Sequence, residues 1–332
     1  MKMPLLSLFK ISDNSKRNGL YSDDIHLGLP KLFKPDCDLS HPQCRPADRS
    51  GVQVLTSLID VGQGDDRDSK AYLREGAREL CHPETELRYH FPSTFKHEIE
   101  VTRALSVPYR WIDSLCIVQG PDGDFDTEAK RMEAVFSSAY CVIAASSDNG
   151  TSRGFLWERP EREVARLDRY LPDDSVYVCE AIDDFQHDVI EGALNKRGWV
   201  LQGRVLAPRT IYFTENQTYW ECGQGVRCET LTKLTNSQAS FLTDSNFPKL
   251  AMRSTRGAKI RFYESLYKQY LNLDFTKIHD RPIAIAALEQ RLVSAFKTEG
   301  GYGVFNGAFF GRSLLWMRDT KRSDCLNLIE FI

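Results

Sequence analysis

Apolar positions recur at helical spacing in two segments near the middle of the chain. The first segment, 95–106, follows a helix start signal at 92–94 and stops before Pro108, because proline disfavours helical geometry in the residue that precedes it. The second segment, 125–139, carries one apolar stripe at intervals of three and four residues. We expect a helix over each of these two ranges.

Short runs of aromatic and branched residues predict strands beside these helices. The run at 109–113 reads YRWID, and the run at 141–145 reads CVIAA, which is typical of a buried strand. Helices that alternate with near-continuous apolar strands favour an α/β fold with a parallel sheet. A right-handed crossover returns the chain beside its start, so we expect these two strands to be parallel neighbours in one sheet.

Weaker patterns extend this organisation in both directions. They predict strands within 52–61 and over 176–179, one or two helical turns over 199–206, and two strands at 210–213 and 218–222. Helical spacing returns in the last third of the chain. We therefore divide the chain into an irregular N-terminal region at 1–88, a core at 89–222 and a mainly helical C-terminal region at 223–332.

Composition is that of a globular protein that works in a reducing compartment. Hydrophobic residues make up 42% of the 332-residue chain and its net charge is −3, which argues against nucleic acid as a partner. No apolar run reaches the roughly 18 residues that a membrane span needs, and the short apolar patch at the start does not form a signal peptide. The nine cysteines are odd in number and irregularly spaced. We expect a cytoplasmic protein with free thiols.

Several ordered motifs resemble those of the fungal heterokaryon-incompatibility (HET) domain. They are STF at 93–95, YRWIDSLCIVQ at 109–119, DFDTEAKRMEAVFSSAYCVIAAS at 124–146 and RGWVLQGRVLAPRTIYF at 197–213, with TYWEC closing the domain at 218–222. Their order and spacing match the family as well as their residues do. The residues that these motifs single out for structural roles are Trp111, Cys116, Arg197, Trp199, Gln202 and Arg209.

The resemblance implies an intracellular self/non-self recognition module of fungal innate immunity. Such a module triggers programmed cell death through protein partners or self-association. The chain departs from the family pattern at two places. A first strand of the form Tyr-x-x-Leu-Ser-Tyr-x-Trp-Gly is not found, since the stretch at 75–90 that stands in its place is too short. Gly203 also follows Gln202 where the family has a glutamate that would pair with Arg197 or Arg209.

HET domains are in turn similar to TIR domains, which implies a flavodoxin-like, mostly parallel sheet flanked by helices. Some TIR domains cleave NAD with a glutamate, which by position corresponds to Glu128, and a pocket at Asp113 and Ser114 would lie at the carboxyl end of a strand. This chain would then be an NAD glycohydrolase with NAD as its substrate. Alternatively, Glu128 only completes an acidic first helical turn, and Asp113 is a cap or pairs with Arg197 or Arg209.

Cys116 offers a second candidate for catalysis. It follows a predicted strand, and His90 or His97 could activate it as a nucleophile. No protease signature surrounds Cys116, and free cysteines are commonly buried. We favour a structural role for this residue.

The remaining candidate chemistry lies in the N-terminal region. The spacing of Cys37, His41 and Cys44 is compatible with three zinc ligands, with Cys81 or His82 as a fourth. The closely paired ligands of tight zinc motifs are absent, so the sequence favours a proline-bounded loop, and we expect no metal. Three functions remain open: a non-catalytic interaction module, an NAD-cleaving enzyme, or a decayed and inactive family member.

Overall fold

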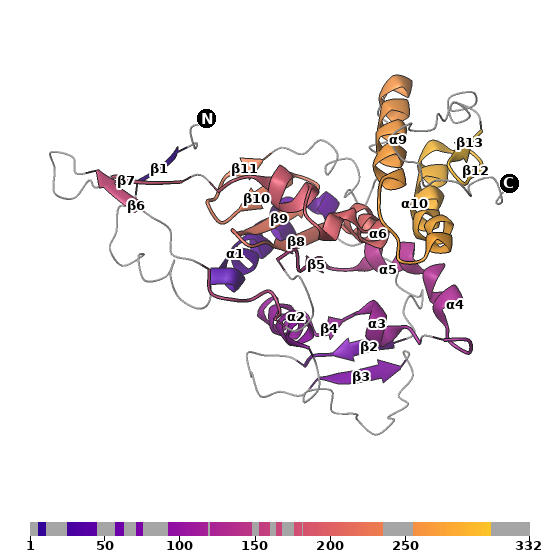
Figure 1. The fold of residues 1–332 in the computed structure, drawn as a ribbon, viewed down its shortest axis with the longest axis horizontal. Coiled ribbons are helices and arrows are strands. Elements are labelled where there is room, and N and C mark those ends of the chain that lie inside the picture. Colours follow the sequence, from indigo (N-terminus) through magenta and orange to yellow (C-terminus); the bar gives the residue numbers. More distant parts are fainter. Residues whose placement is uncertain are drawn as a thin grey trace.

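The computed structural model describes residues 6–10, 25–44, 57–62, 71–75, 92–118, 120–147, 153–159, 164–167, 176–180, 182–234 and 255–306. Its centre is a five-stranded sheet with the order β11-β10-β9-β8-β5 (Figure 1). These strands span Lys233–Leu234, Gly225–Cys228, Thr218–Cys222, Arg209–Phe213 and Val142–Ala144, respectively. Strands β8 to β11 are antiparallel, whereas β5 runs parallel to β8. Every residue of β8 and β9 is buried.

Two three-stranded antiparallel sheets accompany the central one among the described residues. One has the order β3-β2-β4, with strands at Tyr72–Glu75, Ser57–Asp60 and Tyr109–Arg110. Figure 1 shows it beside α2 (Ser93–Ala104) and apart from the central sheet. The other has the order β1-β7-β6, with strands at Leu6–Lys10, Val176–Glu180 and Val164–Leu167.

The expected parallel pairing of 109–113 with 141–145 is wrong. The first segment forms β4, which pairs antiparallel with β2, and the second forms β5 in the central sheet. Two local features explain the difference. The chain enters α3 (Asp113–Cys116) directly after Ile112, which leaves only two residues in β4. The predicted helix at 125–139 is broken into α4 (Phe125–Ala129) and α5 (Met132–Ser138), so it is not one crossover helix.

The fold class is therefore α/β with a mixed sheet, and the mostly parallel, flavodoxin- or TIR-like arrangement is not confirmed. The single parallel pair in the central sheet joins β5 to β8, which follows α6 (Gly198–Leu206). Several local predictions are confirmed: the helix α2, the helical turns of α6, and the β8–β9 hairpin. A strand does precede the YRWID segment and lie beside it, namely β2 within the predicted range 52–61.

The N-terminal segment is part of the central core. Helix α1 (Ile25–Ser40) and the short 3-10 helix η2 (Pro42–Cys44) lie against the central sheet (Figure 1). Phe33 of α1 belongs to the same hydrophobic cluster as Ile211 of β8 and Trp220 of β9. Residues that the sequence assigned to an irregular region thus cover one face of the sheet.

Helices also lie in the described sequence before β8 and after β11. A π-helix, η4 (Gln186–Ile190), and a 3-10 helix, η5 (Leu194–Lys196), precede α6. After β11 come α9 (Arg256–Leu271), the 3-10 helix η6 (Ile278–Asp280), α10 (Arg281–Phe296) and the hairpin β12–β13 at Gly300–Gly301 and Val304–Phe305. One apolar cluster joins α6 to α9 and α10. The sheet also continues past residue 222 into β10 and β11, so packing crosses the predicted boundary there. Within the described ranges, no helix combines the length and the apolar character that crossing a bilayer requires.

Candidate functional site

A cavity of about 1050 Å³ lies between the small sheet with its helices and the central sheet. Its wall is formed by residues of α2, β4, α3, α5, β5 and α6. Such a volume is at the upper end of the range for small-molecule sites. The predicted pocket residues Asp113 and Ser114 both line this cavity, as do the motif residues Trp111, Arg197 and Trp199.

Asp113 and Trp199 both line the cavity, from α3 and α6 respectively. Asp113 starts α3, and one of its carboxylate oxygens accepts a hydrogen bond of 2.7 Å from the backbone N–H of Ser114. Trp199, in the first turn of α6, stacks edge to face on Phe125 with ring centroids 6.1 Å apart. Both residues line the same cavity.

A charge pair holds α2 to β4 inside the cavity. Arg110 donates to Glu98 through Nε at 3.1 Å and through a terminal nitrogen at 2.9 Å, and both side chains are largely buried. A bidentate pair of this kind fixes both side chains. The Arg110–Glu98 pair forms part of the cavity wall. Glu98 is thus already paired, whereas the carboxylate of Asp113 on the same wall is exposed.

Glu128 occupies a different environment from the one the TIR comparison implies. Its side chain is only 1% exposed, and one carboxylate oxygen lies 3.0 Å from a guanidinium nitrogen of Arg131, one helical turn further on. Glu128 is not among the residues that line the cavity, although Phe125 of the same short helix is. Asp113 and Ser114 therefore line the cavity as predicted for a pocket, whereas Glu128 does not.

The glycine that departs from the family pattern has a packing role. A Cβ atom on Gly203 would lie 3.1 Å from the Phe136 ring, which is closer than ordinary contact. Gln202, beside it, is buried, and neither atom of its amide finds a hydrogen-bond partner among the described residues. The carboxylate that pairs with Arg209 is Asp38 at 2.7 Å. Within the part of the chain that the structure describes, neither Arg197 nor Arg209 forms an ion pair with Asp113.

Cys116 has the surroundings of a structural thiol. It is 2% exposed, and burial raises its pKa to about 11. The Nδ1 atom of His97 accepts hydrogen bonds of 3.0 Å from the backbone N–H groups of Phe155 and Leu156. His97 therefore braces a loop, and the second candidate base, His90, lies outside the described residues.

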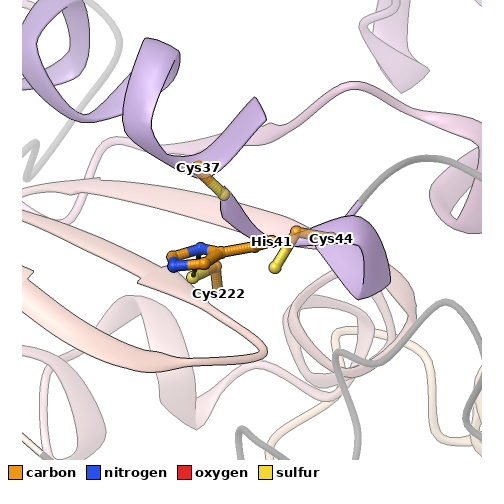
Figure 2. Close-up of side chains that lie close together, drawn as sticks. All are labelled: Cys37, His41, Cys44 and Cys222. Carbon is orange, nitrogen blue, oxygen red and sulfur yellow. Dashed lines mark hydrogen bonds between the residues drawn. The ribbon is translucent and has the colours of Figure 1, made fainter. Parts of the chain in front are cut away.

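A second cluster of chemistry-bearing residues lies where the end of α1 meets the end of β9. Cys37, His41, Cys44 and Cys222 are all buried, and their ligand atoms lie within 4.8 Å of one another. Figure 2 shows the four side chains converging from the end of α1, the turn after it, η2 and the end of β9. These residues could together hold a metal ion.

Arg209 adjoins this cluster. Its Nε donates to the Cys37 sulfur at 3.2 Å, and other guanidinium nitrogens donate to Asp38 at 2.7 Å and to the Tyr140 carbonyl at 3.2 Å. The guanidinium also lies over the Tyr140 ring, 4.4 Å from its centroid. The motif arginine is thus fully buried at the junction of α1 with the sheet.

The neighbouring sulfurs and Arg209 determine where negative charge settles in the cluster. Hydrogen bonds from Cys222 and Cys44, together with Arg209, hold the pKa of Cys37 well below its usual range. Hydrogen bonds with Cys222 and Cys37, together with burial, raise the pKa of Cys44, and the hydrogen bond with Cys37 raises the pKa of Cys222 to about 11. Cys37 is therefore the most readily deprotonated of the three thiols.

Cys222 is the member that sequence reasoning missed. The sequence offered Cys81 or His82 as the fourth residue, and both lie outside the described residues. Cys222 is far from Cys44 along the chain, and its only sequence signal is its position at the end of TYWEC. The β8–β9 hairpin carries it to the end of α1, which no local pattern reports.

Comparison with known proteins adds one finding. Residues 64–203 match the model of the family described as heterokaryon incompatibility protein (HET). This segment contains the motifs at 109–119 and 124–146, and it ends at Gly203, within the RGWVLQGRVLAPR motif. Neither a curated protein nor a solved structure gives a significant match.

Proposed function

We propose that this chain, which carries a heterokaryon-incompatibility (HET) domain at residues 64–203, is a fungal self/non-self recognition module. The family match is the observation that carries this proposal. In this role the protein acts in the cytoplasm, binds protein partners or further copies of itself, and triggers programmed cell death as a form of innate immunity.

The surface around the cavity supports recognition of a protein. Tyr109 lines the cavity and is 50% exposed, and Val118, just after the lining residue Ile117, is 58% exposed. Aromatic side chains beside a partly apolar pocket are typical anchors of protein interfaces. Asp113 and Arg197 add charge of both signs at the same wall.

The position of Glu128 favours an interaction module over an enzyme. A catalytic carboxylate must reach the bond that breaks, but Glu128 is buried against Arg131 and does not line the cavity. NAD cleavage is the alternative function. An assay of nicotinamide release from NAD by the wild type and a Glu128 variant tests it.

The proposed function is tested by inducible expression in a filamentous fungal host with colony viability as the readout. We expect wild-type protein to reduce viability and Tyr109→Asp to abolish the effect, because a buried carboxylate would oppose docking of a partner. The matched control is Tyr302→Asp, at a tyrosine that is 83% exposed on the distant β12–β13 hairpin. It should behave as wild type.

Two outcomes would contradict the proposal at different levels. Undiminished growth with soluble wild-type protein at matched abundance would argue against a role in cell death. Equal killing by the wild type and Tyr109→Asp would exclude the cavity rim as the docking surface.

A further inference from the structure

We propose that Cys37, His41, Cys44 and Cys222 together bind one structural zinc ion, which ties α1 to β9. The four residues are buried and their ligand atoms already lie within 4.8 Å of one another. The proposal is independent of the cell-death role, because it concerns how the chain is held together.

The distances suit a single tetrahedral ion. Zinc binds sulfur at about 2.3 Å and imidazole nitrogen at about 2.0–2.1 Å, which places ligand atoms roughly 3.5–3.8 Å apart. The Nδ1 atom of His41 lies 3.7 Å from the Cys222 sulfur, within that range. Only a small contraction of the remaining spacings, all below 4.8 Å, is needed to close the shell around an ion.

Local backbone structure explains why three ligands come from one short segment. Cys37 and His41 are four residues apart, so the last turn of α1 places them on one face, and the His41 N–H donates to the Cys37 carbonyl at 3.2 Å. The Cys44 N–H then donates to the His41 carbonyl at 2.9 Å, which closes a second turn. Cys222, the last residue of β9, completes the set from across the core (Figure 2).

The donor set selects zinc and a structural role. Three thiolates and an imidazole are soft and intermediate donors, and Cys₃His is one of the common structural zinc shells. The four donors fill a tetrahedron and leave no open position for water or substrate. Their close spacing fits one ion rather than an iron–sulfur cluster. Iron–sulfur clusters are also usually ligated by four cysteines, whereas one ligand here is a histidine.

Arg209 balances the charge that this shell would carry. Three thiolates and one Zn²⁺ sum to −1, which is costly to bury without a counter-charge. The buried guanidinium of Arg209 donates from Nε to the Cys37 sulfur at 3.2 Å and thus lies in the second shell of the proposed ion. Such outer hydrogen bonds to ligands are a regular feature of metal sites.

The zinc would join segments from both sides of the family match. All four ligands lie outside residues 64–203, three before that range and one after it. The ion would therefore fasten the N-terminal helix to the strand that follows the domain. Binding free energy of this kind contributes directly to folding.

The first test measures zinc in the full chain, purified under reducing conditions from cells supplied with zinc. Elemental analysis should find about one zinc per chain in the wild type. Cys222→Ser should lose most of it. Cys116→Ser and Cys228→Ser are matched controls, because both replace buried cysteines outside the cluster, and both should keep the full amount.

A second measurement covers the case in which Cys222→Ser fails to fold. Wild-type protein loaded with Co²⁺ should show the intense visible absorption bands of a tetrahedral thiolate site. These bands should disappear when added Zn²⁺ replaces the Co²⁺. Folded wild-type protein that stays free of zinc after zinc is added would overturn the proposal. A disulfide between two of the cluster cysteines under reducing conditions, or unchanged zinc in Cys222→Ser, would overturn it as well.

Discussion

Arg209 donates a hydrogen bond from Nε to the sulfur of Cys37 at 3.2 Å, across 172 positions of the sequence. This contact joins the arginine of the RGWVLQGRVLAPR motif to an N-terminal helix that lies outside the family match. The motif arginine therefore acts where α1 meets the sheet, whereas Trp199 of the same motif lines the cavity.

Replacement of Arg209 by methionine should destabilise the protein strongly. Arg209 is 0% exposed and its guanidinium has Asp38, the Tyr140 carbonyl and Cys37 as partners, so its loss removes one hydrogen-bond donor from each of these groups. We expect a loss of about 2–3 kcal/mol in the free energy of unfolding, less than for a fully buried pair because Asp38 is 37% exposed. Urea denaturation measures it.

Arg227→Met is the matched control for this prediction. Arg227 also pairs with an aspartate of α1, Asp36, but their side chains are 27% and 41% exposed. Pairs of this kind contribute about 0–1 kcal/mol. Equal losses in the two variants would show that burial of Arg209 does not determine its importance.

A second prediction concerns the buried network on the other face of the sheet. Arg204 of α6 forms two hydrogen bonds of 3.1 Å with Glu221 of β9, and the Tyr212 hydroxyl donates to the same carboxylate at 2.6 Å. Arg204→Met leaves Glu221 buried without its cation and should cost about 3–5 kcal/mol of stability. The double variant with Glu221→Leu should recover a large part of that loss.

Thermal or urea unfolding of the two single variants and the double variant completes this cycle. The coupling is expected because the two side chains share one network. Strictly additive losses would mean that Arg204 and Glu221 act separately, in conflict with the geometry.

Gly154 should not tolerate alanine. Its φ is +76°, and an added Cβ would lie 2.3 Å from Nδ1 of His97, the atom that accepts the Phe155 and Leu156 N–H groups. Backbone strain alone costs about 1 kcal/mol, and displacement of His97 adds to it. Gly120→Ala isolates the strain, since Gly120 has φ +110° and nothing within 4 Å of the added atom. If the two variants melt at the same temperature, His97 does not brace this loop.

Part of this architecture follows directly from the sequence. Local signals are enough for α2, which has a start signal and a proline after its end, and for the β8–β9 hairpin, whose strands flank a short polar turn. Such signals report which residues share a face of an element. They do not report which element covers that face.

Most of the failures of sequence reasoning are of this second kind, and the broken helix at 125–139 is a local one. Nothing in the two residues of β4 specifies β2 as their partner, and nothing in β5 specifies β8. The apolar stripe at 125–139 continues through the break between α4 and α5, so periodicity alone cannot reveal it. Cys222 joins the cysteine cluster only because the central sheet brings β9 to the end of α1.

The stability of the protein should fall in alkaline solution partly through Cys116. Burial raises the pKa of this thiol from 9.0 to about 11, so the folded protein keeps the proton after the unfolded chain has lost it. The contribution is complete below pH 9 and is lost as the pH rises through 11, with a total of about 3 kcal/mol. Urea titrations from pH 8 to 11 should show a shallower decline for Cys116→Ala than for the wild type. Identical slopes would mean that this thiol titrates alike in both states.

The last prediction is that the purified protein releases little or no nicotinamide from NAD. Cleavage of the glycosidic bond needs a carboxylate that can approach the ribose as positive charge develops there. The cavity offers Asp113 and Ser114 on its wall, but Glu128 is 1% exposed, is held by Arg131 at 3.0 Å and does not line the cavity.

Incubation of the wild type and Glu128→Gln with NAD, followed by chromatography of nicotinamide, distinguishes the possible results. Robust release that Glu128→Gln abolishes would establish an enzyme and would require Glu128 to turn into the cavity. Release that survives Glu128→Gln but is lost in Asp113→Asn would place the reacting carboxylate on the cavity wall instead. We expect neither, because the pair with Arg131 stabilises Glu128 where it cannot meet a substrate. Asp113, the exposed carboxylate among the described residues at the wall, already accepts the Ser114 N–H at 2.7 Å.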